Sequence, residues 1–567
     1  MPPTFSTYFS FSEFNGGTRA TFDQFRDELS QFNGPAVVYV CSVMNAVITD
    51  WQGHYRAEAH DELVRNSFAP HFAERIIAEG RNPENHRGVY HRRQLLFVSK
   101  QAILVCPETG GKDPRIPPYG GEMGRLLLMA NDLLPKGLTH SGPALLTPDQ
   151  MINVMSEFIP IGEASGAFRA INKIVRSRLM VDRFFPKAGT EIRRIFEEKT
   201  GVTLDEYFAL CLATLCRYSD LDFKKYQADP GSFVLSEGWY RTTPVSPTVL
   251  ASFLAEISAT REDFTQSLSK RKDAASDFTC FRSKPIFREN QDHFLIDSLC
   301  LAEKGESGAF WSINEALPKT ARFRFHQDWG LAFESYVNWL IAESADELLN
   351  YMYPNPKFCD TGEEVSDALI VCGDSLLFVE SKGATFTADA KYGTDPDRLR
   401  DEIETKLVQS RESGKGIGQL ATRIAEAFDR KRPRAIQGLD TSKINKAFPV
   451  LVTRDDIGAA LVVNAYLVSR FRDLFNRKSV SVTVKPPHVL SAQDLEMLCG
   501  YLREASFADL LDERYRNDRN MLSSFWLIDN AIIDRIGERE CKPFADVMHA
   551  HFQTVAKTLF PCGEAGG

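Results

Sequence analysis

Two carboxylates and a lysine stand close together in the second half of this 567-residue sequence, in a pattern that suits phosphodiester hydrolysis. Asp367 begins one apolar run, and Glu380 and Lys382 end the next one. Carboxylate oxygens are hard ligands that select Mg²⁺ or Mn²⁺. A cation held by Asp367 and Glu380 would bind a phosphate oxygen and lower the pKa of a bound water. Lys382 would orient that water or stabilise charge on the phosphorus.

The two apolar runs are expected to form a β-hairpin that turns at Gly373-Asp374, because glycine suits a tight two-residue turn. That register places Asp367 directly opposite Glu380; a four-residue loop would keep it, and a three-residue loop would not. Side chains alternate across a strand and cross-strand partners share a face, so Asp367, Glu380 and Lys382 fall on one face. Both faces are otherwise apolar, which predicts strands buried on both sides.

Burial of two unpaired carboxylates would be costly, and a bound divalent cation would relieve their repulsion. The alternative is an ordinary hairpin, with Asp367 at a strand edge and Glu380 and Lys382 as a surface ion pair. Strands this apolar rarely expose a face, which favours the buried site.

The pattern resembles the PD-(D/E)xK, or restriction-endonuclease-like, superfamily, whose signature is an acid on one strand and Glu-x-Lys on the next. Asp367 and Glu380-Ser381-Lys382 match that order and spacing, although Ser366 stands where the family name has proline. The resemblance covers about residues 325–485. It implies a mixed sheet flanked by helices, with Mg²⁺- or Mn²⁺-dependent cleavage of nucleic acid.

The family often has a further acid on the helix before these strands, and some members use a glutamine on the helix after them. Gly330–Val337 has the helical spacing for the first element, and Glu334 stands at the edge of its apolar face. The resemblance therefore makes Glu334 a metal ligand, with a solvated helix residue as the alternative. Gln419 is the candidate for the second role, but its own helical spacing turns it nearly opposite the apolar face.

The elements downstream of the hairpin alternate between strand and helix. Strands are expected at Phe448–Thr453 and Val480–Val484, and Ser491 should cap a helix with Asp494 three residues later. Strands separated by helices predict a parallel component in the sheet. We therefore expect a multi-domain α/β chain.

Residues 1–225 are expected to form a mixed, mostly helical domain. Pro35–Cys41 predicts one strand, and Gln94–Val98 with Ala102–Cys106 predicts a strand pair. The region lacks a cluster of acids, histidines or nucleophiles and a phosphate-binding glycine loop. It is therefore expected to serve regulation, targeting or oligomerisation, through a second copy of the chain or a partner protein.

Two further segments complete the expected organisation. Residues 226–274 should be a linker with helices, because Gln227–Pro247 is rich in Gly, Pro, Ser and Thr. Ser246-Pro247 is typical of a helix start. Residues 275–567 should then form the nuclease-type domain, with a β segment near Pro285 to Leu301 and a helical C-terminal extension.

Composition limits the setting. The net charge of −9 argues against a generally basic coat, but Arg411–Arg434 has seven Lys/Arg against three acids and could line a phosphate-binding surface. No apolar run is long enough for a bilayer, and no secretory signal is visible. Eleven cysteines occur singly, which is typical of buried thiols in a reducing cytoplasm.

These features predict a cytoplasmic, metal-dependent nuclease that acts on DNA in preference to RNA. A large unassigned domain joined to such a nuclease resembles bacterial anti-phage or restriction effectors, which is an analogy of architecture. The alternative is a catalytically inactive module that keeps the fold and binds DNA or protein.

Overall fold

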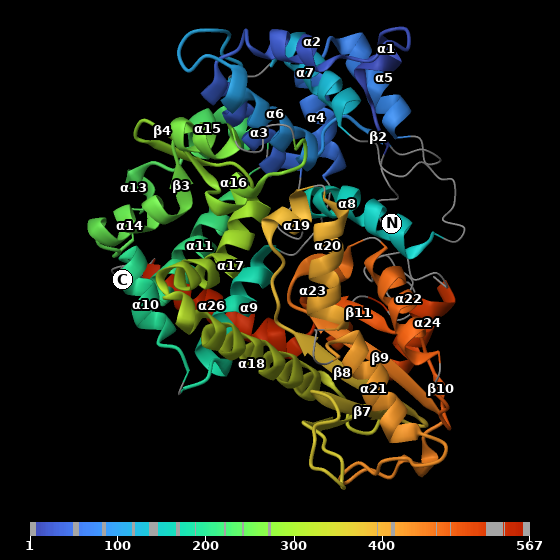
Figure 1. Cartoon of the computed structure of the whole chain (residues 1–567). Helices are drawn as coiled ribbons and strands as arrows, with labels where there is room; N and C mark the ends of the chain where they lie inside the picture. Colours follow the sequence, from blue (N-terminus) through green and yellow to red (C-terminus); the bar gives the residue numbers. More distant parts are fainter. Residues whose placement is uncertain are drawn as a thin grey trace.

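The chain is a multi-domain α/β protein, as the sequence predicts: helices make up 62% of it and strands 12%. The computed structural model describes residues 7–559 apart from 49–55, 82–86, 116–118, 135–145, 166–169, 188, 220, 222, 241–242, 270–273, 394, 410–413, 461, 477, 518–536 and 538. Figure 1 places the N-terminal helices and the β7–β8 hairpin at opposite ends of the molecule.

The largest described sheet is mixed, with the strand order β10-β9-β8-β7-β6 and with β11 also paired to β9. The pairs β6–β7 and β7–β8 are antiparallel, whereas β9 runs parallel to β8, β10 and β11. The expected parallel component is therefore present. The strands span Tyr351–Pro354 (β6), Ala368–Cys372 (β7), Ser375–Lys382 (β8), Lys446–Thr453 (β9), Thr483–Val484 (β10) and His488–Ser491 (β11).

The predicted hairpin is confirmed with its register. Cys372 pairs with Ser375 across Gly373-Asp374, and Ala368 pairs with Val379. Gly373 has φ +62°, as the first position of a type II′ turn requires. The two faces of the hairpin pack into two different cores. One core takes Ala368, Ile370, Cys372, Leu377 and Val379, and the other takes Leu369, Leu376 and Phe378.

Helices cover both faces of this sheet. The long helix α18 (Lys319–Ser344) packs against β8 and β6. Helix α21 (Ile417–Phe428) packs against β8 and β9, and α22 (Val463–Phe475) packs against α21 and β11. Ser491 and Asp494 form the predicted capping box of α23 (Ala492–Cys499), which packs on α18. The remaining helices of this part are α19 (Ala388–Tyr392), α20 (Pro396–Ile403), the π-helix Glu404–Val408 and α24 (Phe507–Asn517).

The three strands predicted in the N-terminal region are wrong. Pro35–Cys41 lies in helix α3 (Gly34–Ile48), and both segments of the expected strand pair lie in α6 (Arg92–Val105) or at its end. These helices pack against each other and are buried on nearly all sides. A helix buried all round has no polar face, so its short apolar runs cannot be distinguished from strands by periodicity.

Helices α2 (Phe22–Leu29), α4 (Ala57–Ser67), α7 (Gly120–Leu133) and α8 (Pro148–Ser165) pack against this pair. Helix α1 (Phe11–Phe14) packs against α7, and α5 (Pro70–Gly80) packs against α4. A two-stranded parallel sheet pairs β1 (Thr7–Tyr8) with β2 (Arg87–Gly88). One hydrophobic core contains buried residues from this region and from later elements as far as Leu559.

The expected linker contains short helices and ends as predicted. Ser246 Oγ accepts a hydrogen bond from the Val249 N–H (3.2 Å) and caps α14 (Pro247–Ile257). The β segment expected near Pro285 is a hairpin of β4 (Ile286–Glu289) and β5 (Asp292–Leu295), with β3 (Ser258–Ala259) beside β4. Other elements here are α12 (Phe223–Ala228), the 3₁₀ turn Pro230–Phe233, α13 (Glu237–Tyr240), α15 (Arg261–Ser269) and α16 (Thr279–Ser283).

Helices from both sides of the expected domain boundary at residue 225 pack against one another. The boundary itself stays a prediction. Helix α17 (Ser298–Ala316) packs against α9 (Ala170–Leu179), α10 (Ile192–Thr200) and α11 (Leu204–Ser219). The last described helix, α26 (Lys542–Leu559), packs against α9, α11 and α18. Helix α8 packs against α19, α20 and α22. None of the helices that the structure describes combines the length and apolar character needed to cross a bilayer.

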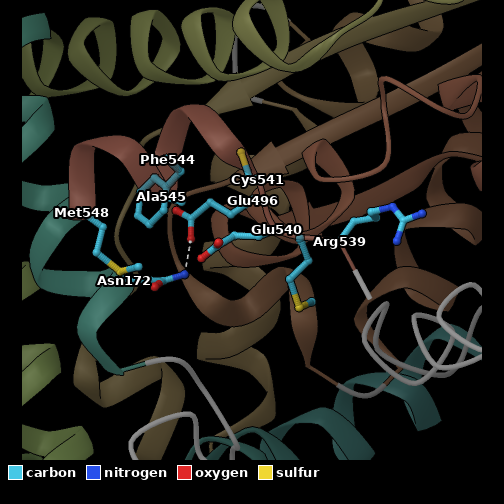
Figure 2. Close-up of a pocket in the computed structure, with 9 residues that line it drawn as sticks. Asn172, Glu496, Arg539, Glu540, Cys541, Phe544, Ala545 and Met548 are labelled. Carbon is cyan, nitrogen blue, oxygen red and sulfur yellow. Dashed lines mark hydrogen bonds between the residues drawn. The ribbon is translucent and has the colours of Figure 1, made fainter. Parts of the chain in front are cut away.

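A buried ionic network joins α9 to the sheet domain. The Arg176 guanidinium, 1% exposed, pairs with Glu496 of α23 and with Glu306 of α17 (2.6 Å). The Tyr336 hydroxyl of α18 donates to the same Glu496 oxygen (2.7 Å), and Asn172 donates to the other oxygen (3.3 Å). Figure 2 shows Asn172 and Glu496 facing each other beside α26.

Candidate metal centre

The site lies where β7 begins and β8 ends. Asp367 directly precedes β7 and is 7% exposed, and its Oδ2 accepts a hydrogen bond from the Ser381 N–H (2.6 Å). Because the hairpin register extends to Ala368 and Val379, the next residues to face each other are Asp367 and Glu380. Asp367 and Glu380 therefore lie opposite each other, as the sequence predicts.

Glu380 is the most buried acid of the site, at 1% exposed. Its Oε1 accepts a hydrogen bond from the Lys382 ammonium, which stands two residues later on the same face of β8. Its Oε2 is buried and has no hydrogen-bond partner among the residues that the structure describes. A buried carboxylate oxygen without a partner is costly unless another ligand satisfies it.

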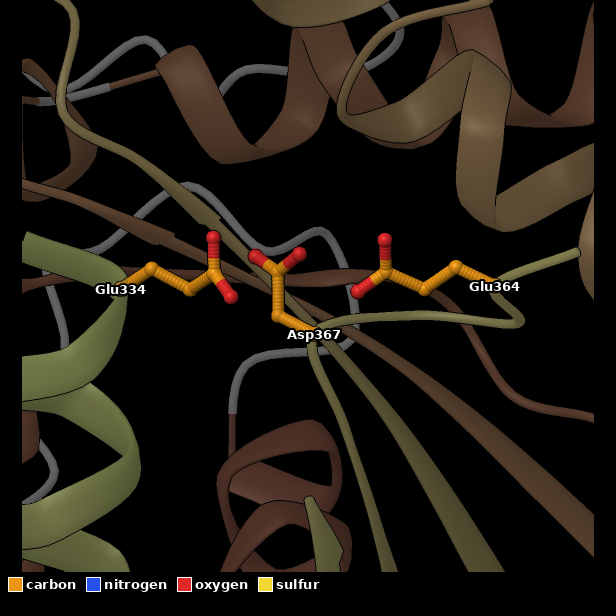
Figure 3. Close-up of side chains that lie close together, drawn as sticks. All are labelled: Glu334, Glu364 and Asp367. Atoms are coloured by element: carbon orange, nitrogen blue, oxygen red, sulfur yellow. The ribbon is translucent and has the colours of Figure 1, made fainter. Parts of the chain in front are cut away.

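Two more acids complete the cluster. Glu334 projects from α18, and Glu364 from the loop before β7, and both face Asp367 (Figure 3). One carboxylate oxygen of each of the three lies within 4.8 Å of the others. The expected position of Glu334 is thus found, with Phe333 and Tyr336 of its helix buried against the sheet.

Sequence reasoning missed Glu364. A local turn brings it back to the site: residues 357 and 364 form a bridge, and the Val365 N–H donates to the Pro356 carbonyl (2.8 Å). The neighbouring Glu363 is held by Arg423 and Arg434 from the basic stretch. The available signal was an acid three residues before Asp367.

The buried acids retain protons more strongly than acids in water. Burial raises the pKa of Glu334 to about 7, with repulsion from Asp367 and Glu364 adding to it. Burial raises the pKa of Asp367 to about 6 and that of Glu380 to about 8, against the opposing attraction of Lys382. Burial lowers the pKa of Lys382, but attraction to Glu380 and Asp367 outweighs it, so that pKa is raised.

These shifts predict that the metal-free protein loses stability as the pH rises. Unfolded carboxyls titrate near pH 4. Groups whose folded pKa is raised stabilise the folded state below that pH, and this contribution is lost as the pH rises through about 6 to about 8. We expect the urea midpoint in EDTA to fall across this window.

The matched variant for this measurement is Glu380→Gln, because it removes the group whose pKa is raised most. Its midpoint should depend less on pH than that of the wild type. Added Mn²⁺ should raise the urea midpoint of the wild-type protein at pH 8, since a bound cation favours the ionised carboxylates. An equal pH dependence in both proteins would show that Glu380 does not titrate as described.

Gln419 and the basic stretch are not brought into this cluster by any described contact. Gln419 lies in the first turn of α21 and is half-buried, and its role stays a prediction. Arg434 binds Asp360 and Glu363, so part of the positive charge is used within the fold. Lys415 and Arg432 are exposed and can contact a phosphate backbone.

Comparison of the chain with protein-family models, with curated proteins and with solved structures found no match. Any functional conclusion therefore depends on the geometry and chemistry of the site.

Proposed function

We propose that this protein is a metal-dependent nuclease that hydrolyses phosphodiester bonds of DNA. The observation that carries the proposal is the convergence of Asp367, Glu380 and Lys382 at one end of the hairpin, with Glu334 beside them. The PD-(D/E)xK resemblance is part of the same proposal. The proposal also includes a cytoplasmic location and a role in anti-phage defence or restriction.

The residues present fit a Mg²⁺ or Mn²⁺ ion. Oxygen ligands suit these cations, and three carboxylates offer oxygens within 4.8 Å of one another. The unpartnered Glu380 Oε2 is a buried ligand atom that nothing else in the described fold satisfies. Asp367 and Glu380 would hold the ion, with Glu334 and Glu364 as further ligands. When bound, it would supply an activated water and neutralise charge on the phosphate.

The side chains of the chain itself have distinct tasks. The Ser381 N–H fixes the Asp367 carboxylate, which lies between Glu334 and Glu364 (Figure 3). The Lys382 side chain is 21% exposed, so its ammonium can reach a phosphate oxygen or a water from its position beside Glu380. A positive charge here stabilises the negative charge that develops on the phosphorus.

The first test is purified full-length protein with supercoiled plasmid, linear duplex DNA and RNA, each with Mg²⁺, Mn²⁺ or EDTA. We expect cleavage of DNA with either metal and none in EDTA. Efficient cleavage of RNA alone would change the substrate and keep the chemistry. If no substrate is cut under any condition but DNA is bound, the inactive DNA-binding module becomes the better description.

A further inference from the structure

An exposed strip of α18 leads directly to the proposed metal centre. Phe323, Gln327 and Leu331 follow one another at four-residue spacing, and Glu334 comes three residues later, so all four share one side of the helix. At about 1.5 Å per residue, Phe323 lies roughly 16 Å along the helix from Glu334. Phe323 is 73% exposed and Leu331 is 51% exposed, which is unusual for such large apolar side chains.

The strip lies beside positively charged groups. His326, three residues after Phe323, contacts the ring of Phe310, and the Arg454 guanidinium lies 5.2 Å from the same ring. The field of Arg322, Lys406 and Arg454 adds to burial in lowering the pKa of His326. Arg322, Lys406 and the nearly buried Arg454 therefore lie near His326, and Lys406 pairs with Glu402.

Arg454 connects this positively charged region to β8, the strand that carries Glu380 and Lys382. It directly follows β9, and its backbone N–H donates to the Lys382 carbonyl (3.0 Å). Its side chain is 6% exposed and lies over the rings of Phe310 and Trp329, while Nη1 has no hydrogen-bond partner in the described part of the chain. Glu306, Asp455 and Asp456 attract this guanidinium from a distance, but the buried Nη1 atom still lacks an acceptor, and a phosphate oxygen is one that Arg binds well.

The acid of this segment of α18 does not neutralise Arg322. Asp328 is the one acid within residues 319–330, and it is buried and held by Arg324 and Thr190. Arg322 donates to the Leu317 carbonyl (3.1 Å), and its charge has no carboxylate partner among the described contacts. Arg322 thus keeps a positive charge beside Phe323 in a chain whose net charge is −9.

We propose that this strip binds a single-stranded segment of the nucleic acid that continues from the metal centre. A base stacks on Phe323, and neighbouring phosphates lie against Arg322 and Arg454. An exposed aromatic ring among cations is the combination that binds unpaired nucleic acid, because only an unpaired base offers its face. This inference rests on the proposed function and adds a substrate class to it: DNA with a single-stranded end, flap or gap.

The test is fluorescence anisotropy of the full-length protein in EDTA, with labelled single-stranded DNA and with a blunt duplex of the same length. Phe323→Ala should weaken single-strand binding about tenfold, within the range measured for one base–aromatic stack, and leave duplex binding nearly unchanged. Phe323→Trp should retain single-strand affinity. Leu348→Ala is the matched control, because Leu348 is a 94% exposed apolar side chain outside the strip.

A second variant examines the phosphate contact. Arg454→Met should keep the apolar packing between the two rings and lower the salt dependence of single-strand binding by about one unit of slope. Unchanged single-strand affinity in Phe323→Ala, or an equal loss in Leu348→Ala, would overturn the proposal and favour a protein partner for this strip. Because binding is measured without metal, a failure of cleavage elsewhere does not affect this result.

Discussion

Replacing Glu380 by glutamine is expected to reduce DNA cleavage about a hundredfold or more without destabilising the protein. The substitution keeps the shape of the side chain and removes one negative charge from the metal centre, and loss of one electrostatic stabiliser in a preorganised site has this order of effect. Burial raises the pKa of Glu380 to about 8, so the ionised form is already disfavoured there. A neutral amide should leave the free energy of unfolding unchanged or increase it.

Lys382→Ala is the companion variant, because it separates the ligand role from the charge-stabilising role. It should also abolish cutting, yet leave metal binding largely intact, since lysine is not a ligand. Calorimetric Mn²⁺ titration and a plasmid-cleavage time course distinguish the two variants. Lys446→Ala is the matched control at the opposite end of the same sheet, where Lys446 pairs with Ser375. Wild-type cutting rates in both Glu380→Gln and Lys382→Ala would refute the catalytic assignment.

Arg176→Ala is expected to produce the largest loss of stability, about 3–5 kcal/mol, by the usual cost of removing one partner from a buried ion pair. Arg176 is 1% exposed and contacts both Glu306 and Glu496. The substitution would leave Glu496 without its paired cation and Glu306 with Lys173 as its remaining ion-pair partner in a low-dielectric interior. The urea midpoint of the metal-free protein measures this effect.

The control for that measurement is Arg75→Ala, which removes an exposed arginine paired with Glu79 on the same helix. Exposed pairs of this kind contribute little, so its midpoint should match that of the wild type. A similar midpoint for Arg176→Ala would show that the buried network is not needed for stability.

The hairpin and its acids could be predicted because the signals are local. A glycine at the turn and strict alternation fix which residues share a face, and no distant contact is needed to place Asp367 opposite Glu380. Glu334 could be predicted because helical spacing marks the edge of its apolar face. Both signals lie within short segments of the chain.

Other features depend on distant contacts, which a single sequence does not reveal. Glu364 reaches the site only because its loop turns back on itself, supported by Arg423 and Arg434, which contact Glu363 from 60 and 71 residues later. The apolar runs within α3 and α6 predicted strands because these two helices bury each other and lack a polar face. The ionic network joins α9 to α23, and nothing in either segment alone indicates that partner.

The position of Tyr336 has a consequence for dissecting this protein by truncation. Tyr336 is two residues from Glu334 on α18, and its hydroxyl shares Glu496 with Arg176 of α9. Deleting the first 225 residues would remove Arg176 and Lys173, so Glu306 and Glu496 would lose their cations and part of the shared core would be exposed. The truncation would therefore destabilise α18, the helix that carries Glu334. An inactive truncated protein would reflect that structural damage and would say nothing about regulation by the N-terminal region.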